Sequence, residues 1–188
     1  MKKLETYAEI LAHYEWQGRI AALDEIRWMR ESVDLRDAIV RAAESRKENG
    51  ALFRHQRHLE DDRAAEGRDL LLAEIEEVAI AGDFHELFLF VEKLVGGVDG
   101  LKEMFVYDVA YRIGAFRDIW PAHVYLHRGT RDGAVVMGFD GTRQWIDVNE
   151  FPAEFHQTEA HFLENILCTH RDDLAVVRKR LAKAKPRP

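Results

Sequence analysis

Apolar residues recur at intervals of three and four positions along most of this chain, and that spacing is the strongest constraint on its fold. Two stretches show it most clearly, each directly after an aspartate that can cap a helix N-terminus, Asp34 and Asp83. The apolar positions that follow these caps are Ala38, Ile39, Ala42 and Ala43, and then Phe84, Leu87, Phe88, Val91, Leu94 and Val95. The spacing predicts an all-α, multi-helix orthogonal bundle with at most a minor extended segment.

Glycine, proline and capping residues predict where the helices begin and end. Gly18 is expected to interrupt the first helix, and the pair Asn49-Gly50 to end the helix that Asp34 begins. A helix is expected over 103–116, before the Trp120-Pro121 step. Residues 123–127 form the best candidate for an extended piece, and Thr130 is expected to cap a brief helix that follows it.

The charge distribution separates the C-terminus from the rest. Residues 1–68 read as an N-terminal helical region packed on or extending a core, and 69–177 as the helical core domain. Residues 178–188 are expected to form a basic, flexible tail. The whole chain has 27 basic and 34 acidic groups, a net charge of -7. Six of the basic groups lie in this tail, so residues 1–177 contain 21 basic and 34 acidic groups. Such an acidic body opposes broad attraction to nucleic acid.

The compartment follows from what the sequence does not contain. A single cysteine, Cys168, excludes an intramolecular disulfide and a cysteine-rich zinc site. The chain has no run of eighteen apolar residues, and its first residues lack the apolar core of a signal peptide. We therefore expect a cytoplasmic protein with no membrane partner.

The common catalytic signatures are absent. The sequence lacks Gly-x-Ser-x-Gly, a phosphate-binding Gly-Lys-Ser/Thr loop and a dinucleotide fingerprint, so no cofactor is expected. Cys168 falls on an apolar helix face, where a buried and inert thiol is the expectation. Histidine pairs occur at 55/58, 123/127 and 156/161, but no carboxylate pattern accompanies them, so no metal ligands are assigned.

The stretch Leu94–Gly133 gathers the side chains that best fit a binding site. Arginines and histidines near a helix N-terminus would bind a phosphate, a nucleotide or a carboxylate. A structural interpretation stays open beside this one: Arg112 paired with Asp108 four residues earlier, His127 bonded to a carbonyl, and the tyrosines in the core. The candidate binding residues are Gly97, Gly100, Tyr107, Asp108, Arg112, His127, Arg128, Thr130 and Arg131.

Residues 85–133 read as a helix, a glycine hairpin at Gly97-Val98-Asp99-Gly100 and a second helix. This stretch resembles the helix-hairpin-helix region of the DNA glycosylase superfamily. The resemblance implies that backbone amides of the hairpin contact a DNA phosphate. Tyr125 stands where that superfamily has its catalytic aspartate, and Asp99 places a negative charge in the hairpin. The resemblance therefore implies a relative that has lost the glycosylase machinery.

Three functions remain open at this point. The leading one is a non-catalytic helical protein that binds an anionic partner, nucleic acid first, through residues 94–133. The alternative is an enzyme, either a divergent DNA-glycosylase relative or a helical metal-dependent hydrolase. The third is an interaction module that forms a homodimer through its N-terminal helices.

Overall fold

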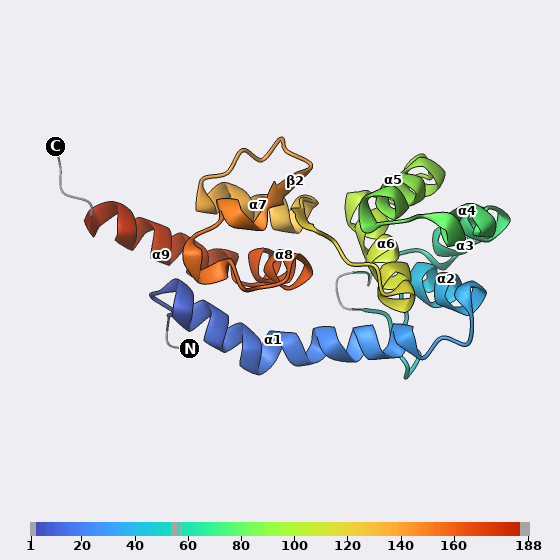
Figure 1. Ribbon diagram of the computed structural model, residues 1–188, viewed down its shortest axis with the longest axis horizontal. Helices are drawn as coiled ribbons and strands as arrows, with labels where there is room; N and C mark the ends of the chain where they lie inside the picture. Colours follow the sequence, from blue (N-terminus) through green and yellow to red (C-terminus); the bar gives the residue numbers. More distant parts are fainter. Residues whose placement is uncertain (1–2, 54–55, 57, 185–188) are drawn as a thin grey trace. The chain divides into compact units, whose positions relative to one another are not determined.

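The computed structural model describes residues 3–53, 56 and 58–184, and its helices confirm the all-α expectation. The helices are α1 (Tyr7–Arg30), α2 (Leu35–Glu44), α3 (Asp61–Ala73), α4 (Ile75–Ile80), α5 (Phe84–Val95), α6 (Glu103–Arg117), α7 (Arg128–Met137), α8 (Ala160–Thr169) and α9 (Arg171–Ala184). The two strands β1 (His123–Tyr125) and β2 (Trp145–Asp147) form the minor extended element, and two short 3-10 turns follow them, η2 (Val148–Glu150) and η3 (Ala153–Phe155) (Figure 1).

The chain divides into two compact units, and the division does not follow the expected boundaries at 68 and 177. Unit 1 contains the residues up to 22 and those from 122 onward, and unit 2 contains residues 23–121. The boundary between them falls inside α1. The expected basic tail is part of unit 1, where residues 178–184 continue α9 as helix, and residues 185–188 lie outside the described part of the chain.

The first helix continues through Gly18, contrary to the expected interruption. A Cβ at position 18 would overlap the ring of Tyr14, which is fully buried. The glycine therefore makes room for an aromatic ring on the preceding turn. A glycine costs a helix interior only about 1 kcal/mol relative to alanine, which the burial of such a ring outweighs.

Unit 2 is built around α6, which packs against α2 and α5. The cap at Asp34 is confirmed, because its side chain accepts a hydrogen bond from the Asp37 amide at 2.8 Å. The four apolar positions of α2 predicted from the spacing are all buried. The expected end at Asn49-Gly50 was wrong: α2 ends at Glu44, where Ser45 takes the left-handed conformation with φ 53°.

The helix pair α5 and α6 agrees closely with the sequence prediction. Asp83 caps α5 by accepting a hydrogen bond from the Glu86 amide at 2.9 Å. The apolar stripe of α5 faces α6, and the two helices lie side by side in Figure 1. Residues 96–102 connect them as a short hairpin, so the two ends that this hairpin joins lie close together.

Unit 1 combines the β1–β2 pair with α7, α8 and α9. The strands are antiparallel, with His123 opposite Asp147, which confirms the expected extended piece. Thr130 does not occupy the capping position predicted for it. His127 is the N-cap of α7 and precedes Thr130 by three residues. The backbone N–H of His127 donates a hydrogen bond to the Thr130 hydroxyl at 2.8 Å. The helix thus begins two residues before Thr130.

Gly133 permits a close approach of α7 to α8. A Cβ at this position would overlap the backbone carbonyl of Leu167, which cannot rotate away as a side chain can. We expect Gly133→Ala to lower the free energy of unfolding by about 2 kcal/mol, as overpacking of a tight core does. Urea unfolding monitored by circular dichroism measures it. Gly97→Ala is the matched control, because a Cβ there meets no atom within 4 Å; equal midpoints for the two variants would contradict the proposed close packing.

Candidate functional site

The candidate binding residues fall into two groups, one in each unit. Gly97, Gly100, Tyr107, Asp108 and Arg112 belong to unit 2. The residues His127, Arg128, Thr130 and Arg131 belong to unit 1.

Arg112 lies at the centre of a buried polar network. Its side chain has 0% exposure, and its Nε donates to Glu25 at 2.7 Å. Its Nη1 donates to the carbonyl of Ala42 at 3.2 Å and to the Ser45 hydroxyl at 2.9 Å. The guanidinium also lies over the Phe53 ring, 4.3 Å from its centroid. Arg112 therefore joins α1, α2 and α6 within unit 2 and has no surface to offer a ligand.

Charge pairing keeps Arg112 protonated despite its burial. Burial alone would lower its pKa, but the charges of Glu25 and Asp108 outweigh that effect and raise the pKa above its ordinary value. Asp108 lies 3.9 Å from Arg112 and accepts a hydrogen bond from the Gln56 amide at 2.5 Å. The pairing of Arg112 with Asp108 at helical spacing is thus present, and Glu25 is the closer partner.

Tyr107 is a core residue of unit 2. It is 3% exposed and stacks on Tyr111, with the ring centroids 6.0 Å apart. Its ring also lies edge-on to Phe84 at the start of α5. Tyr107 therefore contributes to the packing between α5 and α6.

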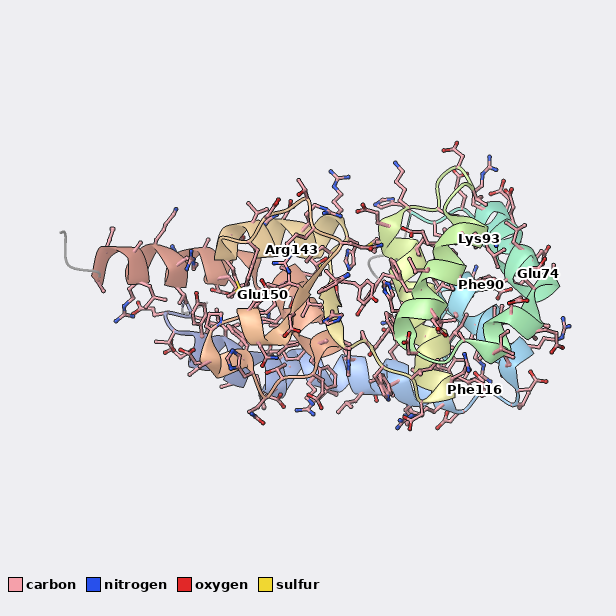
Figure 2. The ribbon with its side chains drawn as sticks, turned by 45° about the horizontal axis from the view of Figure 1, so that its top comes forward. Glu74, Phe90, Lys93, Phe116, Arg143 and Glu150 are labelled. Atoms are coloured by element: carbon pink, nitrogen blue, oxygen red, sulfur yellow. The ribbon has the colours of Figure 1, made fainter. Side chains whose placement is uncertain are left out.

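In unit 1, the side chain of Arg131 binds backbone carbonyls. Its guanidinium donates to the carbonyls of Leu126, Gly141 and Arg143, and so holds the loop after α7 against the end of β1. Arg143 in that loop donates to both carboxylate oxygens of Glu150, at 2.7 and 2.6 Å (Figure 2). This pairing lowers the pKa of Glu150 to about 2.

His127 and Thr130 are buried, whereas Arg128 is exposed. The expected partner of His127 was a carbonyl, but its Nε2 lies 2.7 Å from the carboxylate of Glu164 on α8. Thr130 donates its hydroxyl to the carbonyl of His127 at 2.9 Å, within the first turn of α7. Of this group only Arg128 offers its charge directly to the surface.

The α5–α6 hairpin presents backbone rather than side chains. Val98 and Leu101 are 9% and 2% exposed and anchor it in the core of unit 2. Between and around them, Gly97 and Gly100 are exposed, and Gly100 has φ 87°. Among the described residues, no side-chain hydrogen bond caps the N-terminus of α6, where Lys102 is the N-cap residue. The apolar side chains point into the core and the glycines face outward. Because glycine has no Cβ, this arrangement lets a ligand approach the backbone closely.

The charges around this hairpin are mixed. Lys93 in the last turn of α5 and Lys102 at the start of α6 are exposed cations, and Asp99 lies between them in sequence. The side chain of Arg63 on α3 also reaches the hairpin, since its Cγ would lie 3.8 Å from a Cβ at position 100. Arg63 pairs with Glu66 at 3.1 Å, which reduces the net positive charge there.

Other candidate chemistry has specific structural surroundings. Tyr125, at the position of the catalytic aspartate in the resemblance, is 2% exposed within β1. His123 stacks on Trp145, and His156 bonds the carbonyl of Phe151 at 2.8 Å. Across residues 3–53, 56 and 58–184 no cluster of three potential metal ligands occurs. His55 lies outside the described residues.

Two features of the structure were not predicted from the sequence. Glu25 and Ser45 lie 87 and 67 residues from Arg112 in the chain, and Gln56 lies 52 residues from Asp108, so no local pattern links them to the network. Cys168, expected to be buried, is exposed on the last turn of α8.

No helix among the described residues is long and apolar enough to cross a membrane. Comparisons with protein-family models, with curated proteins and with solved structures found no match to this chain.

Proposed function

We propose that this protein binds the phosphate backbone of nucleic acid through the hairpin of residues 96–102 and the first turn of α6. The observation that carries the proposal is that the apolar residues of this hairpin are buried and its glycines are exposed, next to a helix N-terminus that no side chain of the described residues caps. Unsatisfied amides at such a terminus attract anions, and the partial positive charge of the helix adds to that attraction.

The lysines at the two ends of the hairpin supply the long-range attraction. Lys93, labelled in Figure 2, and Lys102 are carried by adjacent helix ends. Two neutralised phosphates correspond to a slope of about -2 in a plot of log K against log salt concentration. Asp99 and the overall acidic charge oppose binding, so we expect a dissociation constant of about tens of micromolar at low salt.

Salt-dependent titration of a short fluorescein-labelled DNA duplex with the full chain tests the proposal. Replacing both Lys93 and Lys102 by alanine is expected to remove the salt dependence almost completely, since each lysine contributes about one unit of slope. The matched control is the double replacement of Lys179 and Lys183 by alanine on α9, which also removes two exposed positive charges. A slope that disappears in the α9 variant and persists in the hairpin variant would contradict the proposal.

Gly97→Ala tests close approach of the backbone separately from charge. A Cβ at position 97 has open space around it, so the fold is expected to remain intact. The added methyl group would stand between the backbone and a phosphate. We expect binding about tenfold weaker with the salt slope unchanged, because a hydrogen bond to a charged group contributes about 1.5 kcal/mol. Unchanged affinity would mean that the amides at this position do not contact the ligand.

An enzymatic function close to the glycosylases has less support. The position of the catalytic aspartate is occupied by Tyr125, whose ring is buried. The same duplex carrying a damaged base, incubated with the protein and analysed for abasic sites, addresses this alternative. Abasic-site formation above that of the buffer would replace the binding proposal with a catalytic one.

A further inference from the structure

His13 and His170 form a directly hydrogen-bonded histidine pair in unit 1. The Nδ1 of His13, on α1, lies 2.9 Å from the Nε2 of His170, which is the C-cap residue of α8. The two rings are nearly perpendicular, with their centroids 5.2 Å apart. At this distance one of the two nitrogens carries a hydrogen and the other accepts it with a lone pair.

The hydroxyl of Thr169 determines which nitrogen carries the hydrogen. This hydroxyl lies 2.7 Å from the carbonyl of Asn165 and donates to it, because a carbonyl can only accept. It also lies 2.8 Å from the Nδ1 of His170, from which it must therefore accept a hydrogen bond. The neutral His170 imidazole thus has its hydrogen on Nδ1 and a lone pair on Nε2. The hydrogen between the two rings belongs to His13.

The backbone holds His170 in place on both sides. Its N–H donates to the carbonyl of Ile166 at 2.9 Å, and its carbonyl accepts from the N–H of Leu174 at 2.9 Å. The residue therefore joins the end of α8 to the start of α9. His170 is 7% exposed, whereas His13 is half-buried. A change in the histidine pair is therefore expected to move α1 rather than the junction between α8 and α9.

The two protons that this pair can take up have opposite consequences. A first proton on the Nε2 of His13 leaves the hydrogen bond intact, and the Nδ1–H then donates from a cation, which strengthens the bond. A second proton can go only to the Nε2 of His170, since its Nδ1 already carries a hydrogen. Two N–H groups that belong to two cations then face each other. This contact is repulsive, so the rings must separate.

Burial and two charges act on the second proton. Burial lowers the pKa of His170, the charge of His13 on α1 lowers it further, and the carboxylate of Asp173 on α9 acts in the opposite direction. The other neighbours are uncharged: the Thr169 hydroxyl from α8 and the ring of Tyr14 from α1, which lies edge-on to His170. The stability that neutral His170 contributes is therefore present above the ordinary pKa of about 6.5 and is lost as the pH falls through the folded pKa.

We propose that the histidine pair is a proton-controlled contact that holds the first half of α1 on unit 1 near neutral pH and releases it in acid. This part of the helix packs through aromatic rings. Tyr7 contacts Phe155 with ring centroids 5.2 Å apart, and Tyr14 contacts Phe162 with centroids 6.2 Å apart. Both tyrosines are buried, at 4% and 0% exposure. Release of the helix therefore exposes an apolar face that is covered at neutral pH.

His13→Asn tests the coupling within the pair. The asparagine amide takes the place of the imidazole Nδ1, carries no charge, and can present either its N–H or its oxygen to the Nε2 of His170. It therefore keeps the contact in both protonation states of His170. Nitrogen NMR of the imidazoles in the full chain measures the titration. We expect the midpoint of His170 to rise by at least about one pH unit, a tenfold change in proton affinity. An unchanged midpoint would overturn the proposal.

Amide hydrogen exchange followed by mass spectrometry measures the release itself. In the wild type, peptides from the first half of α1 are expected to lose protection at least about tenfold between about pH 7 and about pH 5, after correction for the intrinsic effect of pH. His13→Asn is expected to keep this protection. Ala12→Asn, at an exposed position of the same helix, is the matched control for the helix propensity of asparagine and is expected to lose protection as the wild type does.

The contradicting result does not depend on the folding of any variant. If His170 becomes protonated in the wild type while the α1 peptides keep their protection, the pair does not control the helix. Equal loss of protection in the wild type and in His13→Asn would contradict the proposal as well. His161 is present in all three proteins, so its own titration cancels in the comparison.

Discussion

Replacing Arg112 by alanine is expected to lower the free energy of unfolding of unit 2 by about 4 kcal/mol, the cost typical of breaking a buried ion pair from one side. The guanidinium is fully buried and compensates the carboxylates of Glu25 and Asp108, which are themselves largely buried. Its removal leaves these charges without their partner and creates a cavity beside Phe53. Denaturant unfolding followed by circular dichroism measures the loss.

Arg27→Ala is the control for this prediction. Arg27 also pairs with carboxylates, those of Glu31 and Glu48, but its side chain is 51% exposed. Exposed pairs contribute about 0–1 kcal/mol, so this variant is expected to unfold near the wild-type midpoint. Similar losses from Arg27 and Arg112 would show that burial does not determine the contribution of these arginines.

Acidification is expected to destabilise unit 1 through His161 by about 3 kcal/mol between pH 6.5 and about pH 4. Burial lowers the pKa of His161 from 6.5 to about 4 in the folded protein. The unfolded chain therefore takes up a proton on this imidazole at a pH where the folded chain does not. The contribution of His161 is fully present above pH 6.5 and is lost as the pH falls through the folded pKa.

His161→Leu isolates this effect from the carboxylates that titrate in the same range. The quantity measured is the difference in the free energy of unfolding between wild type and variant at each pH. We expect that difference to change steadily from pH 6.5 downward and to level off below about pH 4. His170, whose pKa burial also lowers, remains in both proteins and cancels. A difference independent of pH would show that His161 is protonated equally in the folded and unfolded states.

The local chemistry of helices explains which parts of the fold were predictable. Asp34 and Asp83 cap helices as predicted because a cap depends on residues within one turn. The helix break predicted at Gly18 was wrong because this glycine leaves room for the ring of Tyr14. That role depends on the packing around the ring, which the local sequence does not reveal. The end of α2 was misplaced because Ser45 takes a left-handed conformation, and its side chain meets Arg112 67 residues later.

The candidate site was predictable in composition but not in arrangement. The sequence placed arginines, histidines and glycines between Leu94 and Gly133, and the structure divides them between two units. Arg112 and Arg131 donate hydrogen bonds to carbonyls within the protein. A sequence pattern cannot distinguish such structural arginines from arginines that bind a ligand. In the hairpin, the glycines at 97 and 100 are exposed, and each is followed by a buried apolar residue, Val98 and Leu101.

Amide chemical-shift mapping of the full chain during titration with a short DNA duplex tests the proposed binding most directly. We expect the largest shifts at the amides of Gly97, Gly100 and Glu103, and we expect these shifts to diminish as salt is added. Shifts concentrated in the basic part of α9, with the hairpin amides unchanged, would contradict it.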